Sequence, residues 1–134
     1  MRYLLDTNIL SELLRHPTGR IRRKLDSAPE GSIYTSMLVA CEMLFGAKRA
    51  GRATLQTDVK RVLASLPVSD VPATAATHYA NVAVSLERAG LGIGIFDTMI
   101  AAHALADGAT VVTANEKHFR RVEGLAVENW MRNA

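Results

Sequence analysis

RYLLDTNIL, residues 2–10, is the stretch that decides the fold, because a short apolar run ends there in three polar residues. Residues 3–5 suit a buried strand, and Asp6 and Thr7 follow with side chains that favour a helix start. In open parallel α/β sheets, ligands bind at the C-terminal edge of the strands, so Asp6 is the first candidate for chemistry. The alternative at this point is that Asp6 merely caps the following helix.

Length and composition predict one globular domain over residues 1–134 that is 49% hydrophobic and 22% charged. The single Cys41 cannot form an internal disulfide, and we expect it to be a small core residue in a reducing cytoplasm. The apolar stretch 91–106 contains Asp97 and is too short to span a bilayer. No signal-peptide pattern opens the chain. We therefore expect a cytoplasmic protein without membrane contact.

The net charge of +3 is unevenly distributed along the chain. Residues 1–67 carry eleven basic and six acidic side chains, whereas residues 68–134 carry five and seven. A basic surface beside an acidic site would attract a polyanion such as nucleic acid. The alternative is that these side chains are solvated helix faces. The basic excess is concentrated in Arg20, Arg22, Arg23, Lys24, Lys48, Arg49, Arg52, Lys60 and Arg61.

Apolar spacing and turn residues predict strands and helices that alternate along the chain, which favours an α/β fold with a central parallel sheet covered on both faces. Trp130 is expected to seal the edge of the core, and His78 to be a surface or packed residue, not a metal ligand. The expected strands are 3–5, 33–35, 67–72, 109–113 and 122–127, and the expected helices are 7–16, 20–27, 36–50, 53–66, 73–89, 96–107 and 117–121.

Two more carboxylates stand at positions where, like Asp6, they could belong to a functional site. Glu42 stands within an apolar helix, within about 60 degrees of its apolar neighbours Leu38 and Phe45, so it is expected on an inward face. Asp97 sits where a helix begins after a glycine-rich turn, either as a cap or as a site residue. Asn115 follows the strand end at 109–113.

If these positions meet, several like charges share one pocket. Each pair at about 4 Å repels by about 4 kcal/mol at an effective dielectric of 20, so the cluster needs a cation or a proton. Oxygen ligands without His or Cys select Mg²⁺ or Mn²⁺ over zinc. Such a site fits phosphodiester hydrolysis by a metal-activated water. Spacing alone does not show that the residues meet.

The chain resembles VapC-type PIN-domain toxins of type II toxin-antitoxin systems over nearly its whole length, because the family's motifs occur in order. These motifs are LLDTNIL at 4–10, SMLVACEMLFGA at 36–47, GIGIFDTMIAAHAL at 92–105, VVTANEKHF at 111–119 and VEGLAVENW at 122–130. The resemblance implies a three-layer α/β/α PIN domain that acts as a Mg²⁺-dependent endoribonuclease and forms a homodimer. It also implies neutralisation by a cognate VapB-type antitoxin, whose helix would occupy an apolar groove.

The resemblance assigns metal binding to Asp6, Glu42 and Asp97, and a DTN turn that orients the first acid. A fourth catalytic position, often Asp in the family, is Asn115 here, so one Mg²⁺ should bind more securely than two. Neighbouring Glu116 could compensate in part. His118 stands where relatives often carry an acid, and no catalytic role is assigned to it.

The ending TANEKHF with VEGL and ENW is most similar to the branch that cuts initiator tRNA in its anticodon region, which we treat as a hypothesis. Two other functions remain open. The chain could be a PIN-fold module that binds RNA or antitoxin with weak or no catalysis, as the neutral Asn115 allows. It could also be a phosphotransferase with Asp6 as nucleophile, although such enzymes need a second acid where Asn8 stands.

Overall fold

The computed structural model describes residues 1–132 and contains one five-stranded sheet in which every pairing is parallel. The strand order is β3-β2-β1-β4-β5, so β1 lies at the centre. The strands are β1 (Tyr3–Leu5), β2 (Ile33–Ser36), β3 (Val68–Ser69), β4 (Thr110–Val112) and β5 (Val127–Glu128).

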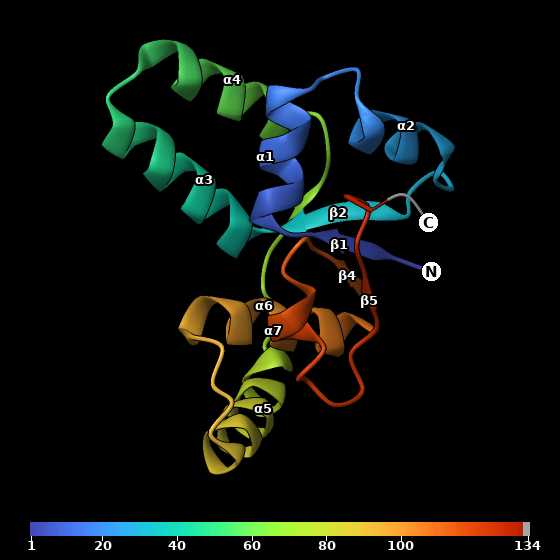
Figure 1. The fold of residues 1–134 in the computed structure, drawn as a ribbon, viewed down its shortest axis with the longest axis vertical. Coiled ribbons are helices and arrows are strands. Elements are labelled where there is room, and N and C mark those ends of the chain that lie inside the picture. Colours follow the sequence, from blue (N-terminus) through green and yellow to red (C-terminus); the bar gives the residue numbers. More distant parts are fainter. Residues whose placement is uncertain (133–134) are drawn as a thin grey trace.

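Helices cover both faces of this sheet, which confirms the three-layer α/β/α arrangement (Figure 1). The first four helices lie on one face and the last three on the other, as right-handed crossovers require when the chain reverses direction across the sheet. They are α1 (Thr7–Arg15), α2 (Arg20–Ser27), α3 (Met37–Ala50), α4 (Ala53–Ala64), α5 (Ala75–Ala89), α6 (Ile95–Asp107) and α7 (Glu116–Phe119).

The reversal occurs between β1 and β4, which are neighbours in the sheet although about a hundred residues separate them in sequence. Leu5 pairs with Val112, so the residues that follow both strands emerge side by side at the same edge. Ligands of open α/β sheets bind at this kind of switch point. The topology therefore places Asp6 and Thr113 at the position where a site is expected.

The core explains why the two central strands are apolar without alternation. Leu4, Leu5, Val111 and Val112 are fully buried, since helices cover both faces of the sheet. Trp130 is buried and its ring centroid lies 5.4 Å from that of Tyr3, which confirms its predicted place at the edge of the core.

Most predicted elements are confirmed, and α2 and α3 have the predicted extents. Ser36 caps α3 through its hydroxyl, which accepts a hydrogen bond from the Leu38 amide, and α3 ends at Gly51 in the left-handed conformation. No helix among residues 1–132 is long and apolar enough to cross a membrane.

Two predictions are wrong. The last strand is not 122–127 but the pair Val127–Glu128, because Gly124 has a φ of +81° and turns the chain within the predicted segment. Cys41 is exposed and is not a core residue. It lies on a solvent-facing apolar stripe of α3 with Phe45, whereas Met43 lies on the opposite, buried stripe of the same helix.

Candidate active site

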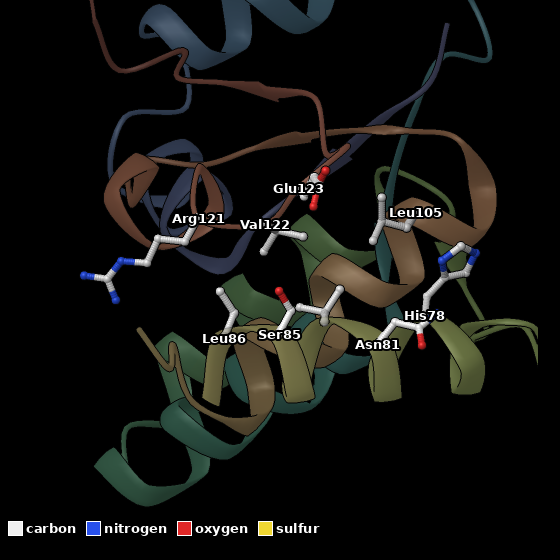
Figure 2. Close-up of a pocket in the computed structure, with 9 residues that line it drawn as sticks. His78, Asn81, Ser85, Leu86, Leu105, Arg121, Val122 and Glu123 are labelled. Atoms are coloured by element: carbon white, nitrogen blue, oxygen red, sulfur yellow. The ribbon is translucent and has the colours of Figure 1, made fainter. Parts of the chain in front are cut away.

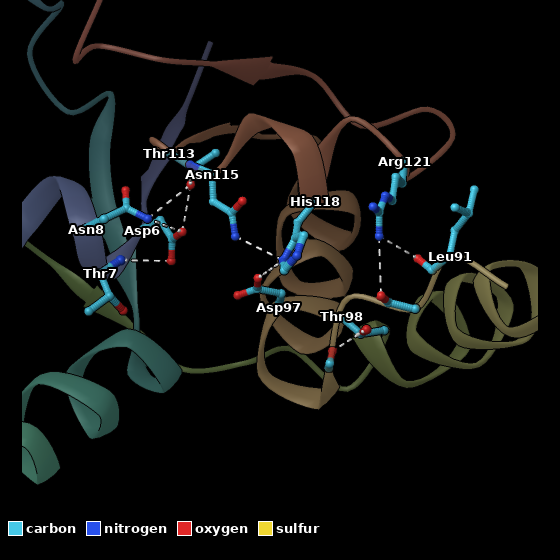
Figure 3. A network of polar contacts seen from close by, with 12 residues as sticks. Asp6, Thr7, Asn8, Leu91, Asp97, Thr98, Thr113, Asn115, His118 and Arg121 are labelled. Atoms are coloured by element: carbon cyan, nitrogen blue, oxygen red, sulfur yellow. Dashed lines mark hydrogen bonds and ion pairs between the residues drawn. The ribbon is translucent and has the colours of Figure 1, made fainter.

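The four predicted site residues line one open cavity of about 390 Å³. Asp6 comes from the end of β1, Glu42 from α3, Asp97 from the first turn of α6, and Asn115 from the turn after β4. Four separate segments therefore converge at the C-terminal edge of the sheet. Figure 3 shows most of the polar contacts that hold them.

Asp6 is the buried centre of the site, with 4% of its surface exposed. One carboxylate oxygen accepts a hydrogen bond from the Thr7 amide at 2.8 Å, so Asp6 does cap α1. The other oxygen accepts from the Thr113 hydroxyl at 2.8 Å and from the Asn8 side-chain amide at 3.2 Å. Asp6 thus caps α1 and lines the cavity at the same time. With both oxygens engaged, Asp6 is poorly placed to act as a free nucleophile, which disfavours the phosphotransferase alternative.

Thr113 and Asn8 lock the two strand ends together. The Asn8 side-chain oxygen accepts from the Ala114 amide at 2.8 Å. The Thr113 hydroxyl accepts from the Asn115 amide at 2.9 Å, and Figure 3 labels both residues beside Asp6. Thr113 was not predicted as a site residue. The signal that could have found it is the pairing of β1 with β4, which the sequence alone does not give.

Glu42 points from α3 toward the end of β1, as predicted, although of the two apolar neighbours behind that prediction only Leu38 is buried and Phe45 is exposed. Its side-chain oxygen accepts a hydrogen bond from the Thr7 hydroxyl at 2.9 Å. Thr7 therefore links the second acid to the residue that follows the first. The Thr7 amide and the Asn8 side chain hold Asp6, so the DTN turn orients two of the three acids.

Asp97 is not a helix cap. Gly94 occupies the N-cap position of α6 with a φ of +90°, and Asp97 is the third residue of the helix. Its carboxylate oxygen lies 3.0 Å from Nδ1 of His118, which α7 supplies (Figure 3). The capping alternative for Asp97 is therefore excluded, and its side chain is free to face the cavity.

The segment around α7 contributes Asn115, which carries no charge, to the cavity. The Asn115 side-chain amide lies 2.9 Å from the same His118 nitrogen. Glu116 turns away and binds Arg120, Arg132 and the Asn129 amide, and the Asn129 hydrogen bond in particular lowers the pKa of Glu116. Glu116 therefore does not compensate for the missing charge at position 115.

The carboxylates are close enough to disturb one another. Burial raises the pKa of Asp6, and the charge of Asp97 adds to this increase, while hydrogen bonds from Thr113 and Thr7 oppose it. Burial also raises the pKa of Glu42, with further contributions from Asp6 and Asp97. Both shifts have the same physical origin, because negative charge is confined where water is partly excluded.

The predicted basic excess lies only partly near the site. Arg15 lines the acidic cavity, and Arg52 lines a groove that continues from it. The cluster from Arg20 to Lys24 lies instead on α2, beside the N-terminal ends of the strands (Figure 1). That part of the basic excess is remote from the acids.

The residues fit a hard divalent cation that keeps part of its water shell. Within residues 1–132, no three Asp, Glu, His or Cys side chains converge tightly enough to surround an ion alone. Mg²⁺ retains several waters and takes only one or two carboxylates directly. The oxygen donors of Asp6, Glu42 and Asp97 match that requirement, and the charge of Asp97 raises the pKa of the other two acids.

A second cavity of about 310 Å³ lies between α5 and the segment after α7 (Figure 2). His78, which is half-buried, and Arg121 line it, but none of the four site residues does. The predicted position of His78 as a surface or packed residue is confirmed. No carboxylate cluster gathers around this cavity, whose one acidic lining residue is Glu123 among the residues that the structure describes.

The fold and the acid cluster define a class of protein. The family model for the PIN domain matches residues 3–125. Ribonuclease VapC2 of Rickettsia felis is 34% identical over 97% of this chain and 98% of its own length. The tRNA(fMet)-specific endonuclease VapC of Shigella flexneri is 32% identical over 97% and 98%. The chain therefore belongs to the PIN-domain family and, within it, to the VapC group.

Solved structures agree with this assignment. The crystal structure of VapBC2 from Rickettsia felis bound to a DNA fragment from its promoter includes a chain of similar fold, with a TM-score of 0.91, 32% identity, and coverage of 97% of this chain and 99% of that one. DNA-bound VapBC from Salmonella typhimurium gives a TM-score of 0.87 and 28% identity, with coverage of 97% and 98%.

Removing one charge from the cluster should stabilise the metal-free protein. The pKa of Glu42 is higher in the folded protein than in the unfolded chain, so the native state holds the carboxyl proton more tightly. The free energy of unfolding therefore falls as the pH rises through the unfolded and then the folded pKa of Glu42. We expect metal-free Glu42→Gln, whose amide oxygen can still accept from Thr7, to melt at a higher temperature than wild type at pH 7. The difference should vanish near pH 4. Differential scanning fluorimetry in EDTA measures it.

The exposed Glu30 offers a matched control, since Glu30→Gln removes the same charge away from the site and should leave the melting temperature nearly unchanged. A lower melting temperature for Glu42→Gln at pH 7 would show that the carboxylate is stabilised in the metal-free site, against the pKa direction given above.

Proposed function

We propose that this chain is a Mg²⁺-dependent endoribonuclease and the toxin of a VapBC-type toxin-antitoxin pair. The observation that carries the proposal is the convergence of Asp6, Glu42 and Asp97 on one cavity, where burial and mutual repulsion raise the pKa of two of them. Negative charge that accumulates in a partly buried cavity at a topological switch point favours the binding of a cation. The names of the relatives supply the reaction class.

The three acids would hold Mg²⁺, or Mn²⁺ in its place. A divalent ion there polarises a phosphodiester and makes a bound water a better nucleophile at neutral pH. Asp6 is held in one orientation by three hydrogen bonds, and Glu42 by one. Asn115 would position water or substrate through its amide. Arg15 on the cavity wall is placed to meet a phosphate group.

As substrate we propose a tRNA, with the anticodon region of initiator tRNA as the specific hypothesis, supported by the name of the Shigella flexneri relative. An enzyme with this substrate acts in the cytoplasm. RNA is recognised mainly by shape and unpaired loop bases. The chain has only three Phe, three Tyr and one Trp, so phosphate contacts should outweigh base stacking.

Cleavage of purified total tRNA tests this function directly. We expect the isolated chain to cut tRNA with Mg²⁺ and to stop in EDTA. Asp97→Asn should lower the cleavage rate by at least about 100-fold. Even the loss of a residue that only hydrogen-bonds a metal ligand lowers activity or metal affinity by about 10–100-fold. Sequencing of fragment ends identifies the bond.

Asp70→Asn is the matched control, because that carboxylate lies between β3 and α5 and does not line the cavity. Intact tRNA after incubation with folded, antitoxin-free protein would favour the second candidate, a PIN-fold module that binds RNA or antitoxin without efficient turnover. The neutral Asn115 is the observation that keeps this candidate open. Cutting of another RNA with initiator tRNA intact would reject only the finer substrate hypothesis.

We further propose that the antitoxin occupies the groove between α1, α3 and α4. This groove, of about 490 Å³, shares Thr7, Ser11, Arg15 and Glu42 with the acidic cavity. Its apolar lining suits the apolar face of a helix, and its open end at the acids would accept a basic side chain. The apolar lining residues are Leu14, Met43, Ala47, Leu55 and Val59.

Gly46 allows this groove to be blocked without disturbing the core. A Cβ added there meets no atom within 4 Å, and the residue lines the groove from α3. We expect Gly46→Phe to keep Mg²⁺-dependent cleavage and to escape inhibition by the purified cognate antitoxin. Lys48→Phe places the same ring outside the groove and should remain inhibited. Full inhibition of Gly46→Phe would place the antitoxin on another surface.

A homodimer is proposed as well. An apolar groove of about 350 Å³ lies between α6 on one side and α5 with the segment before it on the other, and Phe96 nearby on α6 is exposed. The lining of the groove includes Val71, Pro72, Tyr79 and Met99. Such surface favours association. Light scattering of the isolated chain should give the mass of a dimer, and a monomer mass at micromolar concentration would reject this partner.

A further inference from the structure

His118 is the one imidazole in contact with the acid cluster among the described residues. Its Nδ1 lies 3.0 Å from a carboxylate oxygen of Asp97 and 2.9 Å from the side-chain nitrogen of Asn115 (Figure 3). His118 does not itself line the cavity. His118 therefore contacts two residues, Asp97 and Asn115, that do line the cavity.

A single ring nitrogen cannot serve both neighbours in the same way. A carboxylate only accepts hydrogen bonds, so the contact with Asp97 is favourable only when Nδ1 carries a hydrogen. The Asn115 amide must then present its oxygen to that hydrogen or bond elsewhere, and its O and N positions are interchangeable in shape. The charged partner makes the stronger bond, which favours donation to Asp97.

The backbone that carries His118 is firmly anchored. Phe119, the next residue, is fully buried. Arg121 donates to the backbone oxygens of Leu91 and Gly92 at 3.3 and 3.4 Å, so the same segment also holds the loop that leads into α6 (Figure 3). The start of α6 is thus tied to the α7 segment at two points, one through the backbone and one through the side chain of Asp97.

We propose that His118 is a positioning residue that donates its Nδ1 hydrogen to Asp97 and thereby fixes which carboxylate oxygen faces the cation. This role rests on the proposed Mg²⁺-dependent function. It gives a role to the imidazole that contacts Asp97. A residue that hydrogen-bonds a metal-binding side chain without touching the metal holds that side chain in its binding orientation. It thereby reduces the entropy that is lost when the metal binds.

Binding of Mn²⁺ alone, followed by EPR of the free ion, tests the role without RNA. We expect His118→Leu to weaken Mn²⁺ affinity by about 10–100-fold. His118→Gln, whose amide can still donate to Asp97, should stay within about threefold of wild type, the scale of one altered hydrogen bond. His16→Leu, at the exposed far end of α1, is the control and should bind as wild type does.

The tautomer gives a second readout that needs no metal. At pH 8.5, where an ordinary imidazole is neutral, ¹⁵N-resolved NMR of the metal-free protein should find the His118 hydrogen on Nδ1. A hydrogen on Nε2, or unchanged Mn²⁺ affinity in His118→Leu, would overturn the positioning role alone. Wild-type protein that binds no Mn²⁺ would overturn the metal-dependent function and this role with it.

Discussion

The structure depends on keeping the Asp6 carboxylate buried while two other carboxylates are near. Burial and the charge of Asp97 both work against its ionised form. Hydrogen bonds from the Thr7 amide, the Thr113 hydroxyl and the Asn8 amide offset part of this cost. All these donors are neutral, so they hold the charge in place without cancelling it, and the remaining negative potential is available to a cation.

The same constraint explains the sheet topology around the site. Neither strand could supply these donors alone, because Thr7 and Asn8 follow β1 whereas Thr113 follows β4. The parallel pairing of Leu5 with Val112 brings the two turns together, and the Asn8 bond to the Ala114 amide closes the gap between them. A shift in this register would separate Asp6 from Thr113 and leave a buried carboxylate with one fewer donor, so register and site stabilise each other.

Much of this arrangement could be predicted from the sequence, because apolar periodicity and caps are local signals. The ends of α2 and α3 and the inward direction of Glu42 follow from such signals. Cys41 was misplaced because α3 is apolar on most sides, and only tertiary packing decides that the stripe through Met43 is buried. Thr113 and His118 were missed as partners of Asp6 and Asp97 for a related reason, since strand pairing and the placement of α7 are not encoded in local spacing.

Charge balance distinguishes the two sides of the cavity. β1, α3 and α6 contribute one carboxylate each, whereas the α7 side contributes Asn115 backed by His118, because Glu116 binds Arg120 and Arg132 instead. Three negative charges leave a small excess over one divalent cation but fall short of two. On the α7 side, the groups beside Asp97 are the Asn115 amide and the His118 imidazole, which bring no carboxylate for a second cation. If the proposed cation binds here, we therefore expect a single ion between Asp6, Glu42 and Asp97, with the α7 side in its proposed role of orienting Asp97.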